Sequence, residues 1–542
     1  MRRCLINLTR FGDLLQTQPV IHAFHKQGDN VSLICLENFA PAAELLEGVD
    51  QVLPLPGGSI LARLMRDWRL CADDLAAWIR EARTQLCPDE VFNLTPTAGA
   101  RLLGRLMTLP TEQGGAPAAI LNGFGMDAHG FGRNSSPWGS YVQAVTARRG
   151  CSPFNLTDGF FRMAGCSGLA DNTLRSPAPH DIDRAHKLLE EASECFAPAG
   201  ENRGYVAFQL GASADARRWP VEHFAALGRI LWKEARLLPL LMGSAQETEL
   251  AQRCLRLGCP GLDLSGRTSL PVLAAALRQC RLLVTNDTGT MHLAAGLNVP
   301  ILAVFLATAQ PWDTGPYQEN SCNLEPRLDC HPCSFNTPCP HNHACRHAIS
   351  PEAVAELALS RLGEGTWKAG PRVSHEARVW LSKRDEAGFM NLRSLSGDDD
   401  SERGLWLHTQ QVFYRHFLDA WTRENEHTAN KENFSASAFA NLSAFPLESA
   451  RRQRILSIAE KTSGMLHLAL EQGRLLGLRN TEKNRNAFLA TCSRVAGIFA
   501  DSPDFVPLSL LWRTAMQEHG DDLPAIFRFF ELLRQELSAL VR

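Results

Sequence analysis

The chain lacks both the long apolar runs and the charge excess that would direct it into a membrane or onto nucleic acid. No apolar stretch approaches the roughly 20 residues that a transmembrane helix needs. The formal net charge is only -3, from 55 Lys and Arg against 58 Asp and Glu. Such a balance offers no general attraction for nucleic acid or for an anionic membrane, so any phosphate site must be local.

A secretion signal is also missing from the first residues. The apolar stretch that follows Arg2 and Arg3 is much too short for a signal peptide. We therefore expect a cytoplasmic protein, with peripheral attachment at the inner membrane as the open alternative. The 542 residues, 45% of them hydrophobic and 21% charged, are typical of globular proteins and exceed what one core holds.

Two stretches of alternating strand-like and helix-like patterns indicate an α/β fold. The first begins with apolar runs at 3–8, 31–35 and 90–94, separated by helical patterns. The second restarts at Tyr205, with strands expected at 205–209, 237–241, 261–264, 281–285 and 299–305, and helices beginning near Pro220, Ala245, Leu270 and Gly289. We predict two Rossmann-like parallel-sheet domains that face a cleft, residues 1–178 and 179–363.

Other parts of the chain do not show this alternation of strand-like and helix-like patterns. Residues 114–153 are rich in Gly, Pro and Ser, which predicts loops. Residues 364–542 are expected to form a hairpin around 385–388 and then mostly helices. The last helix has one apolar face, which packs in a core, against a partner or against a second copy of the chain. This face consists of Ile526, Phe529, Phe530, Leu533, Leu537 and Leu540.

The most informative segment runs from Asn286 to His292, where an expected strand turns into a helix. Free N–H groups and the positive end of the helix dipole can hold a diphosphate around Thr288, Thr290 and Met291. Gly289 lets a ligand approach the backbone closely, and Asp287 is a candidate helix cap or hydroxyl acceptor. The plain alternative is an ordinary capped helix in which His292 is merely packed.

Three motifs in order resemble the family 9 glycosyltransferases, which include the lipopolysaccharide heptosyltransferases. Along the chain they are Asn-Leu-Thr-Arg-Phe-Gly-Asp-Leu-Leu from residue 7, the segment from Gly211 through Arg-Arg-Trp-Pro at 217–220, and Asn-Asp-Thr-Gly-Thr-Met-His-Leu-Ala-Ala from residue 286. The resemblance covers about residues 3–362. It implies a GT-B fold, an inverting, metal-independent mechanism without a catalytic cofactor, and ADP-heptose as the usual donor.

The resemblance also implies roles for single residues. Asp13 falls where the family has its proposed base, although an Asp near a helix start is often an N-cap. Arg217 stands where the family has a phosphate-binding lysine, and Arg218 is the adjacent candidate. A guanidinium can replace the ammonium and grip phosphate bidentately. Gly12 and Glu247 are further candidates for donor binding. Glu247 matches an acidic residue of the family that is expected near the donor's ribose; the alternative is a surface glutamate at a helix start.

Sixteen cysteines in a chain without a secretion signal are expected to be thiols or metal ligands rather than disulfides. One cluster stands out: Cys330, Cys333, Cys339 and Cys345, with Cys322 as an alternative ligand. Four thiolates from two short turns can enclose a structural zinc or iron, and a nearby histidine could replace one of them. Metal, free thiols and a disulfide all remain open.

The preferred hypothesis is an inverting glycosyltransferase that moves a sugar, most simply heptose from ADP-heptose, to lipopolysaccharide core or to a surface protein such as flagellin. The alternative is an inactive sugar-nucleotide-binding or assembly subunit with the same fold. A sugar-nucleotide epimerase is the third hypothesis.

Overall fold

The computed structural model describes residues 1–64, 67–109, 119–148, 150–194, 202–335, 337–425, 445–446, 448–520 and 522–541. The chain divides into two compact units. We call the first the two-sheet unit, residues Met1–Met126 and Phe154–Ser396, and the second the helical unit, residues Asp127–Pro153 and Gly397–Arg542. In the described part of the chain, no helix combines the length and apolar character needed to cross a bilayer.

The first sheet of the two-sheet unit is parallel, with strand order β3-β2-β1-β4-β5. Its central strands are buried on both faces, as in Val31, Leu33, Ile34 and Cys35, all 0% exposed, which explains their unbroken apolar runs. The strands are β1 (Arg2–Asn7), β2 (Asn30–Leu36), β3 (Gln51–Leu55), β4 (Glu90–Asn93) and β5 (Ile120–Met126). The helices are α1 (Phe11–Leu15), α2 (Gln18–Lys26), α3 (Ala40–Ala43), α4 (Gly57–Leu64), α5 (Trp68–Leu86), α6 (Ala98–Met107) and α8 (Leu156–Met163).

The second sheet has eight strands in the order β14-β13-β12-β11-β10-β7-β8-β9. All neighbours are parallel except the last two pairs at one edge, β12 with β13 and β13 with β14. Its strands are β7 (Tyr205–Gln209), β8 (Leu238–Met242), β9 (Leu262–Asp263), β10 (Cys280–Asn286), β11 (Ile301–Val304), β12 (Cys322–Pro326), β13 (Ala377–Arg384) and β14 (Met390–Ser394).

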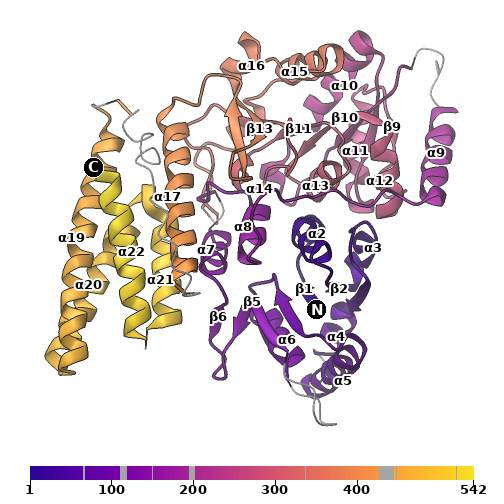
Figure 1. Cartoon of the computed structure of the whole chain (residues 1–542). Helices are drawn as coiled ribbons and strands as arrows, with labels where there is room; N and C mark the ends of the chain where they lie inside the picture. Colours follow the sequence, from indigo (N-terminus) through magenta and orange to yellow (C-terminus); the bar gives the residue numbers. More distant parts are fainter. Residues whose placement is uncertain are drawn as a thin grey trace. The chain divides into compact units, whose positions relative to one another are not determined.

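Helices cover both faces of this second sheet (Figure 1). On the face of α10 and α15, Phe224 and Leu357 pack with Phe208 in one buried cluster. The helices are α9 (Pro179–Glu194), α10 (Val221–Ala235), α11 (Thr248–Arg256), α12 (Leu270–Arg278), α13 (Gly289–Gly296), α14 (Pro311–Thr314), α15 (Pro351–Glu364) and α16 (Pro371–Glu376), with short 3-10 turns η3 (Asp215–Arg217), η4 (Ala245–Glu247) and η5 (Ala344–His347).

These two parallel-dominated sheets confirm the predicted fold class. Each of the five strands expected from Tyr205 onward is present, and helices begin at Val221, Leu270 and Gly289 as expected. The boundary expected at residue 364 is not where the structure divides. The predicted hairpin, β13 and β14, extends the second sheet because β13 pairs with β12 from Cys322↔Leu381 to Pro326↔Ala377.

The prediction of loops for residues 114–153 is wrong over most of the described part of this region. It contains β5, the short strand β6 (Gly132–Asn134) and helix α7 (Pro137–Thr146); residues 114–118 and 149 lie outside the described residues. The Ser136 hydroxyl accepts a hydrogen bond from the Gly139 N–H at 3.2 Å. With Pro137 at the first helical position, this is a standard helix start that the Ser- and Pro-rich composition hid.

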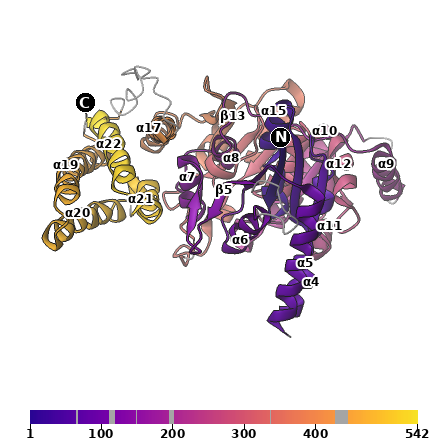
Figure 2. The ribbon, with the colours of Figure 1, turned by 60° about the horizontal axis from the view of Figure 1, so that its bottom comes forward.

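The helical unit consists of α7 with a carboxy-terminal bundle, whose helices α19 to α22 run side by side in orange and yellow (Figures 1 and 2). Trp138 of α7, 1% exposed, donates its indole N–H to Asp419 of α17 at 2.8 Å. The bundle helices are α17 (Glu402–Asn425), α19 (Ala450–Leu478), α20 (Glu482–Ala500), α21 (Val506–His519) and α22 (Leu523–Val541).

The apolar face of α22 is part of the core of this unit. Its six predicted residues are all at most 4% exposed. Phe530 stacks on Trp512 with ring centroids 4.9 Å apart and planes 7° from parallel, and Phe529 lies 4.9 Å from Trp421. Core packing therefore accounts for the pattern, and this face is not available to a second copy of the chain.

A buried carboxyl group joins α8 to the hairpin inside the two-sheet unit. Asp158 accepts hydrogen bonds from the Tyr317 hydroxyl at 2.6 Å and from the Met390 N–H at 3.0 Å. The Arg384 guanidinium donates to the same Tyr317 oxygen at 3.2 Å. Burial raises the pKa of Asp158 from 3.8 to about 7, against the opposing effect of these hydrogen bonds.

This shift predicts a pH-dependent stability. Because the folded pKa lies above the unfolded one, the stabilisation from Asp158 is complete below about pH 4 and is lost as the pH rises through about 7, by at most about 4 kcal/mol. Melting temperatures between pH 5 and pH 8 should therefore fall less steeply in Asp158→Asn than in the wild type. The exposed-carboxylate control Glu249→Gln should keep the wild-type slope. Equal slopes in all three proteins would contradict the prediction.

Candidate functional site

The loop between β1 and α1 is shaped by the asparagine that ends the strand. The Asn7 carboxamide oxygen accepts from the Thr9 N–H at 3.0 Å, and its amide donates to the Asp13 carbonyl at 3.2 Å. These bonds fix Asp13 in the first turn of α1, where it is half-buried. The N-cap residue of this helix is Arg10, so capping does not explain Asp13.

The helix that begins at Gly289 has the start expected for an anion site. Thr288 is its N-cap residue in an extended conformation, and its side chain makes no capping hydrogen bond. The Thr290 hydroxyl donates to the Gln209 side chain at 3.0 Å, and Met291 is 0% exposed. The side chains of Thr290 and Met291 are thus structural, and what this turn offers a ligand is its backbone.

Asn286 contributes through the neighbouring loop. It is 0% exposed, and its amide lies within 3.3 Å of the carbonyls of Gln209, Leu210 and Gly211. Its oxygen accepts from the Trp219 N–H at 2.9 Å. Asn286 therefore holds both ends of the loop 211–219, which carries Arg217, rather than presenting its own side chain to a ligand.

Arg217 lies at the start of α13. Its Nε donates to the Thr308 hydroxyl at 2.8 Å and one terminal nitrogen donates to the Ser213 hydroxyl at 3.4 Å. The same nitrogen lies 3.5 Å from the Asp287 carboxylate, and the two side chains are only 10% and 8% exposed. Arg218 instead turns back to its own loop, where it donates to the Ala212 carbonyl at 3.3 Å.

The two sheets of this unit meet where α1 approaches α13. A Cβ added to Gly12 would lie 3.0 Å from the Gly289 Cα and 3.0 Å from the His292 ring, and one added to Gly289 would lie 2.4 Å from the Phe11 ring. The Gln16 amide nitrogen lies 2.8 Å from His292 Nε2. The predicted residues Gly12 and Asp13 are thus brought to the start of α13.

Glu247 has a clear structural role at the ends of β7 and β8. Its carboxylate accepts from the Ser244 N–H at 2.7 Å and from the Ser244 hydroxyl at 3.0 Å, which completes a capping box. Its other oxygen occupies the space that a side chain at Gly211 would need, 1.4 Å from the ideal Cβ position. A contact with a donor ribose stays a prediction.

The predicted cysteine ligands fall into two groups. Cys322 is buried in β12, and burial raises its thiol pKa. The other four lie together: burial raises the pKa of the Cys333 thiol to about 11, and the nearby Cys345, Cys330 and Cys339 add to this effect. All five are free thiols.

The donor set suits zinc or iron, but its arrangement does not yet form a site. Among the described residues, no group of three or more His, Cys, Asp or Glu side chains could hold a metal ion. The structural metal therefore stays a prediction.

Sequence reasoning missed several residues at this site. Thr308, Gln16 and Phe11 contact the predicted residues, yet Thr308 belongs to no motif and reaches Arg217 only through the fold. Gln16 and Phe11 lie inside the motif that begins at Asn7, so their proximity to Asp13 was the available signal.

Comparison with known proteins supports the resemblance. Residues 126–344 match the model of glycosyltransferase family 9 (heptosyltransferase). Lipooligosaccharide heptosyltransferase 2 of Haemophilus ducreyi is 32% identical over 149 residues, 24% of this chain and 42% of that protein. Lipopolysaccharide heptosyltransferase 1 of Pseudomonas aeruginosa is 34% identical over 173 residues, 29% of this chain and 48% of that protein.

Two solved heptosyltransferase structures align with this chain at low similarity. The structure of Escherichia coli ADP-heptose lipopolysaccharide heptosyltransferase II has a TM-score of 0.47 and 18% identity, covering 68% of this chain and 100% of that one. An iron-containing dodecameric heptosyltransferase in complex with ADP-D-beta-D-heptose has a TM-score of 0.37 and 12% identity, covering 65% and 73%.

The chain spans less than half the length of the two curated relatives described above. The matched range includes Arg217, Glu247 and the segment 286–292, whereas Asp13 precedes it. Over the matched range, the chain is thus similar to the family 9 glycosyltransferases and to two curated heptosyltransferases.

Proposed function

We propose that the chain is an inverting glycosyltransferase that uses a nucleoside diphosphate sugar, with ADP-heptose as the donor. The observation that carries the proposal is the approach of α1, with Asp13, to the start of α13, beside which Arg217 is held. The acceptor class is lipopolysaccharide core, and a surface protein such as flagellin is the second candidate.

The departing diphosphate needs positive charge that is already in place. The first turn of α13 presents its N–H groups and the positive end of the helix dipole. Arg217 adds a guanidinium that stays charged at all relevant pH values. Before a donor binds, the Asp287 carboxylate lies 3.5 Å from the guanidinium and offsets part of the cost of burying its charge beside the helix start.

The attacking hydroxyl needs a base on the opposite side of the sugar. Asp13 removes the proton of the acceptor hydroxyl while that oxygen forms a bond to the anomeric carbon. The bond from the anomeric carbon to the diphosphate oxygen breaks in the same displacement, and the electron pair leaves with the diphosphate, next to Arg217. One displacement of this kind inverts the configuration at the anomeric carbon.

The first test is product identification. The purified chain is incubated with candidate nucleotide sugars and cell extract, and products are analysed by mass spectrometry. Tight ADP binding without any product would favour the alternative of an inactive binding or assembly subunit. Donor conversion without an acceptor would favour an epimerase.

Asp13→Ala should lower kcat/KM by about 100-fold or more, because the acceptor proton loses its base. ADP affinity, measured by calorimetry, should stay near the wild-type value since Asp13 does not face the diphosphate in this mechanism. Asp73→Ala, an exposed aspartate of α5 in the same sheet domain, serves as the control. A wild-type rate in Asp13→Ala would rule out this base.

Arg217→Ala should weaken ADP binding and lower kcat/KM by about 100-fold, because one preorganised donor to the diphosphate is lost. Arg217→Lys should lose less, since it keeps a point charge but not the fork of N–H groups. Arg256→Ala, which removes an exposed ion pair with Glu249 in the same domain, is the control. An Arg217→Ala protein with unchanged ADP affinity would refute the donor-site assignment.

Gly289→Ala should lower kcat/KM by about 10-fold or more, because its Cβ would lie 2.4 Å from the Phe11 ring and displace α1. The double variant Gly289→Ala, Phe11→Ala should recover part of the activity by removing the colliding ring. Gly99→Ala adds a Cβ in open space and is the matched control. If the double variant recovers no activity, a collision with Phe11 is not the reason that Gly289 is needed.

A further inference from the structure

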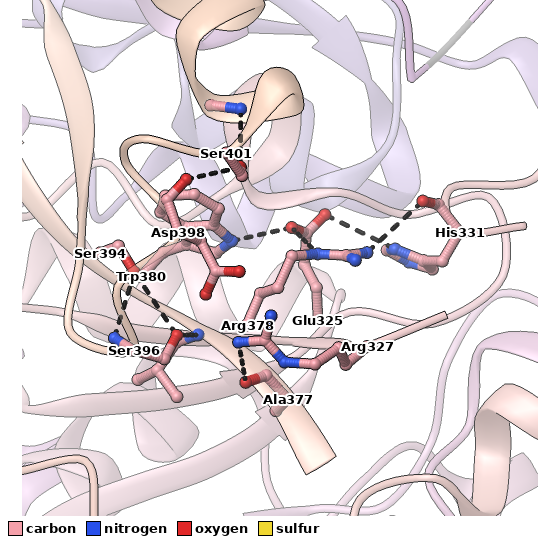
Figure 3. A network of polar contacts seen from close by, with 12 residues as sticks. Glu325, Arg327, His331, Ala377, Arg378, Trp380, Ser394, Ser396, Asp398 and Ser401 are labelled. Carbon is pink, nitrogen blue, oxygen red and sulfur yellow. Dashed lines mark hydrogen bonds and ion pairs between the residues drawn. The ribbon is translucent and has the colours of Figure 1, made fainter. Parts of the chain in front are cut away.

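The segment that contains the clustered cysteines, residues 330–346, is fixed to the edge of the second sheet by a buried polar network (Figure 3). Glu325 of β12 is 0% exposed and accepts a hydrogen bond from the Trp380 indole at 2.8 Å. Its carboxylate lies 3.5 Å from His331 Nδ1 and 3.6 Å from Arg378 Nε. The start of the segment is therefore tied to β12 and β13.

The same segment also binds backbone carbonyls of the loop that follows β11. The Cys333 N–H donates to the Ala307 carbonyl at 2.8 Å, and His331 Nε2 lies 3.0 Å from the Ala309 carbonyl. Ala307 has a φ of 54°, a left-handed conformation that an alanine adopts only where surrounding contacts hold it. Between these two anchored carbonyls lies Thr308, whose hydroxyl accepts the Arg217 Nε hydrogen bond at 2.8 Å.

Two further side chains of the segment act on Arg217 more directly. The Phe335 ring lies under the guanidinium, with 5.3 Å between the Arg217 Cζ and the ring centroid. Arg346 donates from Nε to the Arg218 carbonyl at 3.0 Å and from a terminal nitrogen to the Asp215 carboxylate at 2.8 Å. Asp215 and Arg218 flank Arg217 on either side of the turn η3.

We propose that the segment 330–346 positions Arg217 for the donor diphosphate, with Arg346 and Phe335 as positioning residues. This inference rests on the proposed function. A free arginine side chain loses much rotamer entropy when it binds an anion, whereas an arginine that is already held by a hydroxyl acceptor, by an aromatic ring and by contacts to the backbone of its turn loses little. The segment supplies the ring of Phe335 and the Arg346 contacts directly, and it holds the loop that carries Thr308. The cysteine-rich segment therefore supports the donor site although none of its own residues needs to touch the donor.

The test uses the full chain with its thiols kept reduced, ADP as the ligand and calorimetry as the readout. Arg346→Ala should raise the Kd for ADP by about 5- to 20-fold, and Phe335→Leu by a smaller factor. Arg346→Lys should recover part of the affinity, since it keeps the ion pair with Asp215 but cannot also reach the Arg218 carbonyl. Arg256→Ala should match the wild type.

A double-mutant cycle separates positioning from a general structural effect. In the Arg217→Ala background, Arg346→Ala and Phe335→Leu should change the Kd by less than about 2-fold, because the group that they position is gone. Equal fold-changes with and without Arg217 would overturn the proposal, as would wild-type affinity in both single variants.

The outcome for Arg217 alone distinguishes the two levels of the argument. If Arg217→Ala weakens ADP binding but Arg346→Ala and Phe335→Leu do not, the donor-site assignment stands and the positioning role fails. If Arg217→Ala leaves ADP affinity unchanged, the assignment itself fails, and the positioning role with it. Melting temperatures of Phe335→Leu and Arg346→Lys should equal that of the wild type, which shows that a change in ADP affinity does not come from unfolding.

Discussion

The candidate site depends on the contact between two helix starts from different sheets, α1 and α13. Only backbone fits at the point of closest approach, because a Cβ on Gly12 or Gly289 would meet the opposite helix within 3.0 Å. Two glycines at this point let Asp13 come near the turn at Thr288 without an intervening side chain. The hydrogen bond between Gln16 and His292 then holds the two helices in register.

Strand-ending asparagines give this contact its rigidity. Asn7, Asn93 and Asn286 each end a strand, are at most 1% exposed, and donate amide hydrogen bonds to backbone carbonyls of the segment that follows or of a neighbouring strand and its loop. A buried carboxamide can both donate and accept, so it can fix two loop segments at once, which an aspartate or a leucine cannot do. The loops that carry Asp13 and Arg217 are therefore fixed by the sheets themselves.

The sequence was sufficient for the elements with a strong local signal. Apolar runs located the parallel strands because those strands are buried on both faces. The expected helix start near Leu270 is confirmed, and the structure shows Ser269 as its N-cap. Composition failed in the region 114–153, where Ser136 and Pro137 start a helix instead of a loop. The hairpin was found, but its place beside β12 was not, since register across distant strands leaves no local pattern.

The site follows the same division. Gly289 could be named from the chain because it lies at an expected helix start, and Asp13 and Arg217 because their motifs resemble those of a known family. Their partners Thr308, Phe335 and Arg346 could not, because each reaches Arg217 or its turn only after separate segments have packed. Contacts of this kind depend on the folded arrangement and have no spacing that a sequence pattern records.

The pairing of β12 with β13 has a mechanical consequence for the segment between them. Pro326 and Ala377 face each other across neighbouring strands, so everything from residue 327 to 376 leaves the sheet and returns to it at nearly the same place. The loop is thus closed by the sheet, and the buried Glu325 and Arg378 lock that closure from inside. The cysteine-rich part therefore contacts the loops beside it, at Ala307 and Arg218, from a base whose position is set by the pairing of β12 with β13.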